Sequence, residues 1–379
     1  MDRAPRARFD AQMMGIALRL AARGLGRTSP NPSVGAVIVD ETTGEIVSRA
    51  WTAPGGRPHA EPQAIAKAGA RARGATIYVT LEPCSHHGAT PPCADAIVAA
   101  GIRRVVCAIE DPDPRVAGSG LSRLREAGII VERGVCAEEA HRVTAGHILR
   151  VTERHPYVTA KLALDADGGV PRGGEGQPTW VTGEAARAQG HLLRARSDAI
   201  LVGRRTVIDD DPLLTCRLPG LEDRSPVRIV LARDPAGLEA SRLARTAVEH
   251  PLWVFCAERA DAAALASAGA RIFSMPLVDG QLWLPAVMEA LAASGITRLL
   301  IEGGPATWRS FSRAGLIDEV ALFHARGKER AAVAGEKALQ TLDRYISTGG
   351  LTIYDRRTVG GDDMLALRRP WLRDGTRAA

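Results

Sequence analysis

The chain has 379 residues, which is too long for one domain of typical size and suits two domains. Its net charge of +6 comes almost entirely from arginines dispersed among acidic residues, without a basic block or interleaved aromatic side chains, so a nucleic-acid partner is not expected. A membrane partner is not expected, because the first ten residues are polar and no apolar run is long enough to cross a bilayer. The six cysteines show no framework spacing, which favours a cytoplasmic protein.

The first half of the chain alternates helices and strands. Phe9, Met13 and Ile16 recur at helical spacing and predict an amphipathic helix over 9–23. The apolar run 34–39 predicts a buried strand. The remaining expected elements are helices at 60–71, 93–100, 121–127 and 137–150 and strands at 75–81, 104–109 and 129–132. This order is typical of an α/β sheet, whose ligands gather where the strands end.

Three residues of this half form a candidate metal site: His59, Cys84 and Cys93. One imidazole and two thiolates suit tetrahedral zinc, and a fourth position open to water makes such a zinc catalytic, because the metal lowers the pKa of that water toward neutrality. Glu61 follows the histidine by two residues, where it can shuttle protons beside the metal without binding it. A histidine, a glutamate two positions on and a later proline–cysteine pair with a second cysteine are the signature of zinc nucleobase deaminases, although here the cysteines are nine residues apart rather than three.

Two structural interpretations compete with this one. His86 or His87 lies between the cysteines and could complete a closed four-ligand site with no place for water. Cys84 and Cys93 could instead be ordinary buried cysteines. The catalytic interpretation is favoured because Glu61 has no role in a closed site.

A new series of elements begins after residue 156, which places the domain boundary near 150 and gives domains 1–150 and 151–379. The expected strands are 157–164, 198–202, 227–231, 252–256, 298–302, 318–324, 351–357 and 364–369, and the expected helices are 183–195, 284–294 and 305–314. The segment 326–348 shows no clear period. The glycine fingerprint of a classical dinucleotide-binding fold is missing, since Gly24-Leu25-Gly26 lacks the third glycine and follows a helix.

Beyond the metal cluster, the first half contains the motifs Asn31-Pro32-Ser33-Val34-Gly35, Leu81-Glu82-Pro83-Cys84-Ser85-His86-His87-Gly88, Thr90-Pro91-Pro92-Cys93 and Asp111-Pro112-Asp113-Pro114. In these motifs the chain resembles the bifunctional riboflavin-biosynthesis deaminase/reductase family. The resemblance extends more loosely over the second half, through the segments 157–163, 194–203, 206–217 and 301–305. It implies a cytidine-deaminase-like α/β/α domain followed by a dihydrofolate-reductase-like α/β domain.

The resemblance also implies two successive reactions on phosphorylated pyrimidines. The first domain would remove an amino group from 2,5-diamino-6-(5-phospho-ribosylamino)pyrimidin-4(3H)-one, with one Zn2+ ion per chain and Glu61 moving the protons. The second would reduce the ribosyl side chain of 5-amino-6-(5-phosphoribosylamino)uracil to ribityl with NADPH. The family further suggests a homodimer joined through the second domain.

Individual contacts follow from the same resemblance. The residues expected to bind the nicotinamide cofactor are Leu164, Trp180, Thr206, Asp210, Gly303 and Gly304. Those expected to bind substrate are Asn31, Arg194, Leu214, Arg217 and Glu302. The two arginines suit a phosphate because a guanidinium bonds phosphate oxygens in pairs.

Four of the candidates keep alternative roles. Asn31 could be a turn residue between two prolines rather than a substrate contact. Lys161 could polarise the sugar carbonyl or could be an ordinary strand-edge lysine. His86 and His87 could contact the substrate phosphate or a neighbouring loop.

Departures from the family pattern keep one further hypothesis for the second domain open. The chain has Asp-Ala-Asp-Gly-Gly at 165–169 where the family usually has Ser-Leu-Asp-Gly-Arg, Pro178 where a substrate-contacting serine is usual, and Arg-Gly-Lys-Glu-Arg at 326–330 in place of an apolar, glycine-rich segment. The second domain could therefore be an inactive reductase-like dimerisation module beside a working deaminase. A tRNA deaminase is a more distant alternative. Its zinc cysteines are usually three residues apart rather than nine, and it needs a basic channel, which the dispersed arginines of this chain do not indicate.

Overall fold

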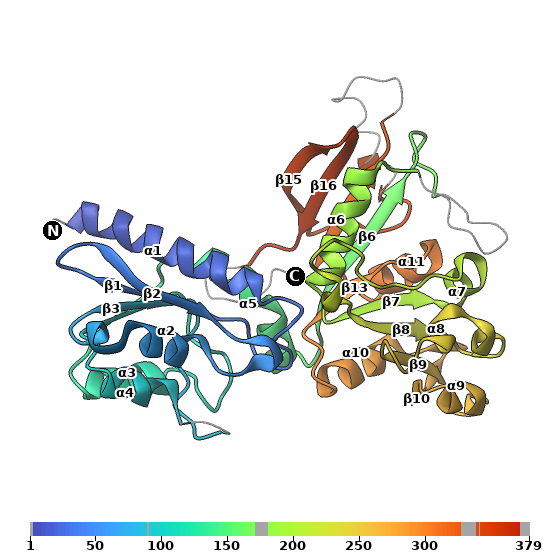
Figure 1. Cartoon of the computed structure of the whole chain (residues 1–379). Helices are drawn as coiled ribbons and strands as arrows, with labels where there is room; N and C mark the ends of the chain where they lie inside the picture. Colours follow the sequence, from blue (N-terminus) through green and yellow to red (C-terminus); the bar gives the residue numbers. More distant parts are fainter. Residues whose placement is uncertain (1–2, 89–90, 171–180, 327–338, 341, 372–379) are drawn as a thin grey trace. The chain divides into compact units, whose positions relative to one another are not determined.

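The computed structural model describes residues 3–88, 91–170, 181–326, 339–340 and 342–371, and the chain forms two compact units, Met1–His155 and Pro156–Ala379 (Figure 1). Helix α5 continues to Thr152, so the division lies a few residues beyond the position near 150 indicated by the sequence. Trp180, Pro178 and the segment 327–338 lie outside the described residues. No helix in the described ranges combines the length and the apolar character of a membrane span.

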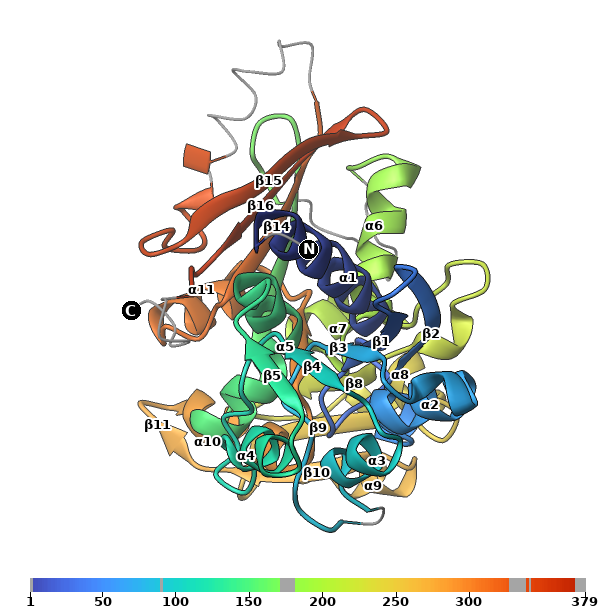
Figure 2. The same ribbon diagram turned by 90° about the vertical axis from the view of Figure 1, so that its left-hand side faces the viewer.

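Unit 1 is a five-stranded sheet between two layers of helices. Its elements are α1 Arg3–Arg23, β1 Gly35–Asp40, β2 Glu45–Trp51, α2 Ala60–Ala68, β3 Thr76–Val79, α3 Cys93–Ala99, β4 Arg104–Cys107, α4 Ser119–Glu126, β5 Ile130–Arg133 and α5 Ala137–Thr152. The strand order is β2-β1-β3-β4-β5; β3, β4 and β5 run parallel, and β1 is antiparallel to both of its neighbours. Helices α1 and α5 cover one face, and α2, α3 and α4 cover the other (Figures 1 and 2).

The central strands of unit 1 are apolar on both faces because helices cover both faces. Residues 35–39 of β1 are all buried rather than alternately exposed, as expected for a strand between two helical layers. Gly35 allows α1 to approach β1 closely: a Cβ at this position would stand 1.9 Å from the carbonyl oxygen of Ala17. The α/β/α expectation for this half is confirmed.

Unit 2 contains a nine-stranded sheet of order β10-β9-β8-β7-β13-β6-β14-β16-β15. Its elements are β6 Tyr157–Leu164, α6 Glu184–Ala195, β7 Ala199–Gly203, α7 Arg204–Asp210, β8 Val227–Leu231, α8 Arg242–Arg245, β9 Leu252–Ala257, α9 Ala263–Ser267, β10 Arg271–Met275, β11 Leu277–Val278, β12 Gln281–Leu282, α10 Leu284–Ala293, β13 Arg298–Ile301, α11 Pro305–Arg313, β14 Glu319–His324, β15 Thr352–Val359 and β16 Asp362–Arg368. In this sheet order, the seven strands from β10 through β14 are parallel to one another. Strand β16 pairs with β14 in the antiparallel sense and forms a hairpin with β15.

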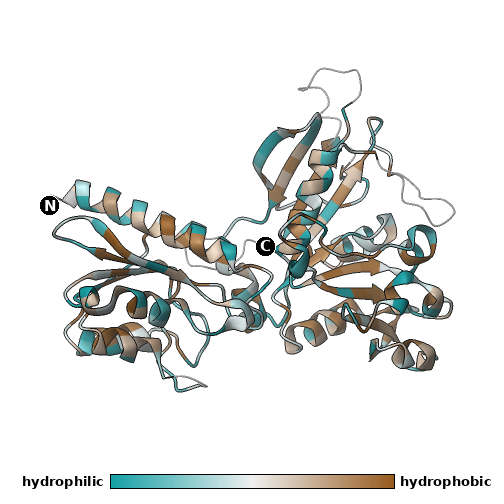
Figure 3. Ribbon diagram, viewed as in Figure 1, coloured by the Kyte–Doolittle hydropathy of each residue, from teal (hydrophilic) through white to brown (hydrophobic). Residues whose placement is uncertain are grey.

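Alternate residues of the central strands of unit 2 face separate hydrophobic cores. Leu299 and Ile301 of β13 pack with α10 and α11, whereas Leu300 packs with residues of α7, α8 and α9. Hydrophobic residues dominate β7 and β8 in Figure 3, as this burial requires. The sheet is therefore covered on both sides, and the expected α/β class is confirmed.

The sequence-based prediction located most of the helices and strands and missed several elements of seven residues or fewer. The missed elements are β2, α7, α8, α9, β10 and the two-stranded hairpin β11–β12. Strand β2 forms an edge of its sheet and includes the exposed residues Glu45 and Arg49, so it lacks the continuous apolar run of β1. The helices α7, α8 and α9 have seven residues or fewer, too few for a helical period to emerge.

Candidate active sites

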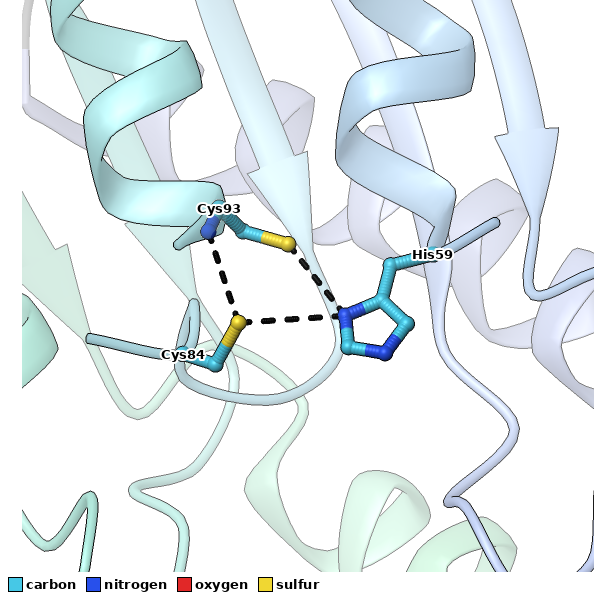
Figure 4. Close-up of side chains that lie close together, drawn as sticks. All are labelled: His59, Cys84 and Cys93. Carbon is cyan, nitrogen blue, oxygen red and sulfur yellow. Dashed lines mark hydrogen bonds between the residues drawn. The ribbon is translucent and has the colours of Figure 1, made fainter. Parts of the chain in front are cut away.

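The candidate metal ligands are brought together by the ends of three elements of unit 1. His59 is the residue immediately before α2, Cys84 lies in the loop after β3, and Cys93 is the first residue of α3. Figure 4 shows the imidazole and the two sulfur atoms turned toward one another. The parallel strands β3 and β4 end at this edge of the sheet, where α/β proteins place their ligands.

The ligand atoms have the spacing that zinc requires. His59 Nδ1 lies 3.3 Å from Cys93 Sγ and 3.8 Å from Cys84 Sγ, and all three ligand atoms lie within 4.8 Å of one another. Tetrahedral zinc with normal bond lengths separates such atoms by about 3.5 Å. Hydrogen bonds from Cys93 and His59, opposed by burial, lower the pKa of Cys84, whereas the hydrogen bond to Cys84 and burial raise the pKa of Cys93. Of the two thiols, Cys84 is therefore the one whose surroundings favour the thiolate form that binds metals. The residues present therefore fit a zinc ion.

The cluster has three protein ligands among the described residues. His86 and His87 follow Cys84 in the same loop but do not join the cluster, so within this part of the chain the closed four-ligand alternative gains no support. Three ligands leave a fourth coordination position for water.

Glu61 lies in the first turn of α2, beside the cluster but outside its ligand set. Its side chain is buried, and its Oε2 has no hydrogen-bond partner in the described part of the chain. Burial raises the pKa of Glu61 to about 7, and a bound cation would oppose this shift. A buried carboxylate oxygen without a partner is costly unless a group of the active complex bonds it.

A second carboxylate, Glu82, fixes the loop that carries Cys84. Its Oε1 accepts hydrogen bonds from the backbone N–H groups of Gly120 at 2.8 Å and Leu121 at 3.1 Å, and its Oε2 accepts from Gly118 at 2.9 Å and Asp111 at 3.2 Å. The segment after β4 is thereby tied to the segment after β3. This role was not foreseen, although Glu82 stands in the quoted motif.

Asn31 lies beside the segment that leads into His59. Its Nδ2 donates to the carbonyl oxygen of Gly56 at 3.3 Å. A Cβ at Gly56 would stand 2.2 Å from that nitrogen, so the glycine is what lets the amide approach. This contact fits a turn-stabilising role and leaves the side-chain oxygen of Asn31 for other partners.

In unit 2, most of the expected reductase residues line one cavity of about 380 Å3. These are Lys161, Arg194, Thr206, Asp210, Leu214, Arg217, Glu302, Gly303 and Gly304. They come from β6, α6, α7, the loop after α7, and the junction of β13 with α11. The structure therefore joins residues that are up to 143 positions apart in the chain.

Two of the expected cofactor residues are not among them. The side chain of Leu164 is fully buried in the hydrophobic core at the end of β6, so only its backbone is left to contact a ligand. Trp180 lies outside the described residues. Conversely, Arg187 and Arg242 line the cavity and were not foreseen. In a chain this rich in arginine, no spacing or motif marked them.

The polar centre of the cavity is an ion-pair cluster. Arg194 donates from Nε and Nη2 to the two carboxylate oxygens of Glu302 at 2.8 and 2.9 Å, and from Nη1 to the carbonyl oxygen of Thr215 at 2.9 Å. Lys161 Nζ lies 3.9 Å from Glu302 Oε2. Burial alone would raise the pKa of Glu302, but the charges of Arg194 and Lys161 outweigh it and lower the pKa to about 2. Burial and the nearby Arg194 lower the pKa of Lys161, against the pull of Glu302.

The junction of β13 and α11 brings backbone close to this cavity. A Cβ at Gly303 would stand 2.8 Å from the side chain of Thr307, whereas a Cβ at Gly304 would meet nothing within 4 Å. Gly304 is the residue before the first turn of α11, so free backbone N–H groups and open space coincide here.

Known proteins resemble both units. Residues 7–109 match the family model for the cytidine and deoxycytidylate deaminase zinc-binding region, and residues 156–364 match that for the RibD C-terminal domain. Among curated relatives, the riboflavin biosynthesis protein RibD of Escherichia coli is 37% identical over 94% of this chain and 99% of its own length. That of Aquifex aeolicus is 40% identical over 84% of this chain and 87% of its own.

Solved structures agree with this relationship over nearly the whole chain. Acinetobacter baumannii RibD has a TM-score of 0.80 at 32% identity and covers 97% of this chain and 100% of its own. A diaminohydroxyphosphoribosylaminopyrimidine deaminase/5-amino-6-(5-phosphoribosylamino)uracil reductase from Thermotoga maritima has a TM-score of 0.79 at 32% identity, with 96% and 99% covered. The chain thus belongs to the RibD family of bifunctional riboflavin-biosynthesis enzymes, with a deaminase unit followed by a reductase unit.

Proposed function

We propose that unit 1 hydrolytically deaminates 2,5-diamino-6-(5-phospho-ribosylamino)pyrimidin-4(3H)-one and that unit 2 reduces the ribosyl group of the product, 5-amino-6-(5-phosphoribosylamino)uracil, with NADPH. The observation that carries the first half is the three-ligand cluster of His59, Cys84 and Cys93 beside the unpartnered carboxylate of Glu61. The observation that carries the second is the cavity that gathers nine of the expected reductase residues.

In unit 1, zinc held by the cluster would supply an activated water for attack on the ring carbon that bears the amine. The work of Glu61 is to hold and move protons at Oε2. It takes a proton from the attacking water and passes it to a ring nitrogen. It then takes the proton of the hydroxyl group now on the ring carbon and passes it to the amino group, which departs as ammonia. Burial excludes bulk water, so the carboxylate exchanges protons with the reacting groups rather than with solvent.

In unit 2, the cofactor would supply a hydride to the sugar carbon. Thr206, Asp210 and the backbone at Gly303–Gly304 are the proposed cofactor contacts, because all of them line the cavity and Gly304 precedes the first turn of α11, where helix N–H groups lack an intrahelical partner. Lys161 and Glu302 form the polar centre that would hold the sugar, with Arg194 fixing Glu302 in place.

Replacing Glu61 by glutamine tests the deaminase assignment. We expect zinc content to stay at one ion per chain, because Glu61 is not a ligand, and ammonia release from the diaminopyrimidine to fall by about 100- to 10,000-fold. Retained zinc shows that unit 1 keeps its fold, and reduction of the deaminated substrate by the same preparation controls for the amount of protein. Substantial remaining ammonia release would show that Glu61 does not carry the proton transfers.

The alternative of an inactive second unit is tested by NADPH oxidation with the deaminated substrate. The intact cavity with its Glu302–Arg194 pair favours an active reductase, despite the departures at 165–169. Absence of turnover beside normal deamination would favour the dimerisation module instead. A parallel assay with NADH measures the cofactor preference.

We also propose a homodimer through unit 2 and a cytoplasmic location. Strand β15 ends the nine-stranded sheet and leaves Ile353 and Tyr354 exposed, 45% and 41% respectively, which suits an interface. All six cysteines are free, as a reducing compartment favours. Light scattering of the purified chain measures the oligomeric state directly.

A further inference from the structure

The loop after α7, residues 211–217, lines the reductase cavity in a conformation that its own sequence does not favour. The cavity is lined by Pro212, Leu213, Leu214 and Arg217 of this loop. Leu214 and the first residue of the loop, Asp211, have left-handed backbone conformations with φ of +57° and +36°, although neither is glycine. Such conformations persist where surrounding contacts hold them. The residues that hold this loop, called the cavity loop below, therefore also set the shape of the cavity wall.

Helix α8 holds the first residue of the cavity loop. The Asp211 carboxylate accepts from the backbone N–H of Arg242 at 2.7 Å. It also forms ion pairs with the side chains of Arg242 and Arg245, at 3.4 and 3.6 Å. These contacts leave the far end of the loop, which carries Arg217, to be held by another element.

Helix α6 holds the last three residues of the cavity loop. Arg194 donates from Nη1 to the carbonyl oxygen of Thr215 at 2.9 Å. The thiol of Cys216 donates to the carbonyl oxygen of His191 at 3.5 Å, and the backbone N–H of Arg217 donates to Nδ1 of the same histidine at 3.3 Å. The imidazole of His191 thus fixes the backbone from which the Arg217 side chain extends.

This hydrogen bond requires a neutral His191 with its proton on Nε2, because only an unprotonated Nδ1 can accept. Burial, together with the charges of Arg194 and Arg217, lowers the pKa of His191 to about 4. Glu302 and the backbone of Thr215 act in the opposite direction and do not outweigh these causes. The imidazole is therefore an acceptor at neutral pH. His191 is not among the described residues that line the cavity, so its effect on a ligand passes through Arg217.

We propose that His191 is a positioning residue of the reductase. It holds the backbone of Arg217 so that the guanidinium enters the cavity in the orientation that binds the substrate. A guanidinium bonds its partners through a planar fork, so a small rotation of the backbone that carries it misaligns these bonds. The proposal rests on the reductase function proposed above, with Arg217 as a contact of the pyrimidine substrate.

The test is calorimetric titration of the full-length protein with 5-amino-6-(5-phosphoribosylamino)uracil in the absence of NADPH, followed by steady-state reduction with the same variants. His191→Leu removes the acceptor, His191→Asn places an amide oxygen near the position of Nδ1, and His191→Gln places one near the position of Nε2. We expect the leucine and glutamine variants to bind the pyrimidine about 3- to 10-fold more weakly and to raise its KM by the same factor, with kcat and the KM for NADPH unchanged. The asparagine variant should stay within about twofold of the wild type.

Gln189→Leu is the matched control. Gln189 lies on the same helix and accepts from Arg357 at 3.4 Å rather than from the cavity loop, so its replacement should leave affinity and KM unchanged. If His191→Leu does not fold, the comparison of His191→Asn with His191→Gln decides alone, because these variants differ only in where the acceptor lies.

Equal weakening in the asparagine and glutamine variants would overturn the proposal, since it would show that the position of the acceptor does not matter. Full affinity in His191→Leu, an equal loss in Gln189→Leu, or a wild-type chain that does not bind the pyrimidine would overturn it as well. A wild-type chain that binds the pyrimidine but does not oxidise NADPH would instead refute the proposed reductase function and leave the binding test of His191 intact.

Discussion

We expect replacement of Glu82 to distinguish the two units most clearly, by destabilising unit 1 while leaving the reduction catalysed by unit 2 unchanged. Glutamine keeps one acceptor oxygen and replaces the other with an NH2 group, so two of the four backbone N–H groups around the carboxylate lose their acceptor. A hydrogen bond to a charged group contributes about 1.5–3 kcal/mol, which gives a loss of about 3–6 kcal/mol before the loop relaxes. Relaxation reduces this figure, and we expect Glu82→Gln to lower the free energy of unfolding of unit 1 by about 3 kcal/mol.

The assay is urea unfolding of the full-length protein combined with hydrogen exchange of the peptide that spans 110–121. Faster exchange at Gly118, Gly120 and Leu121 is expected, with weaker zinc retention and unchanged reduction of the deaminated substrate. Glu110→Gln is the matched control, because the Glu110 side chain is 44% exposed and pairs only at the surface with Arg133, so its loss should change stability by about 0.5 kcal/mol or less. A change below about 1 kcal/mol in Glu82→Gln, with normal exchange, would refute the reasoning.

Three further outcomes are expected. Prolonged chelation should abolish ammonia release while NADPH oxidation continues, and equal loss of both activities would contradict a zinc site confined to unit 1. The pKa of Glu302 is lowered from 4.5 to about 2, so its ionised form stabilises unit 2 by roughly 3 kcal/mol. This stabilisation is complete above pH 4.5 and is lost as the pH falls toward 2. The free energy of unfolding of unit 2, measured across this range, should therefore depend less on pH in Glu302→Gln. Gly35→Ala should lower the melting temperature of unit 1 by an amount equivalent to about 3 kcal/mol, since the new Cβ would overlap the carbonyl of Ala17, and an unchanged melting curve would show that α1 can shift freely.

The zinc ligands were predictable because their chemistry is specific. Few residue types bind zinc, and His59, Cys84 and Cys93 lie where expected strands end or helices begin, so the fold expectation and the ligand expectation support each other. Glu61 could be placed beside them for the same reason, since two residues along a starting helix bring it near His59.

The reductase cavity was only partly predictable because arginine has several common uses. Arg194 and Arg217 were both expected to bind phosphate, yet Arg194 donates hydrogen bonds from three of its nitrogens to Glu302 and Thr215. Arg242 reaches the cavity from a four-residue helix that no periodic pattern announces, and it is positioned by the left-handed backbone of Asp211. Backbone conformations of this kind are set by tertiary contacts rather than by local sequence, so they emerge only from the folded chain.

The two units solve the same structural problem with charges of opposite sign. Each active site lies where parallel strands end, and the loops there need support that the sheet does not provide. In unit 1 the buried carboxylate of Glu82 accepts from backbone N–H groups of the neighbouring loop, and in unit 2 the buried guanidinium of Arg194 donates to the backbone carbonyl of Thr215. A backbone N–H or C=O group can bond such a charged side chain whatever side chains the loop carries. The sequence of the loop can therefore change, whereas the charged residue that holds the loop cannot lose its charge. Substitutions at Glu82 and Arg194 should therefore be as damaging as substitutions of residues that contact the substrates.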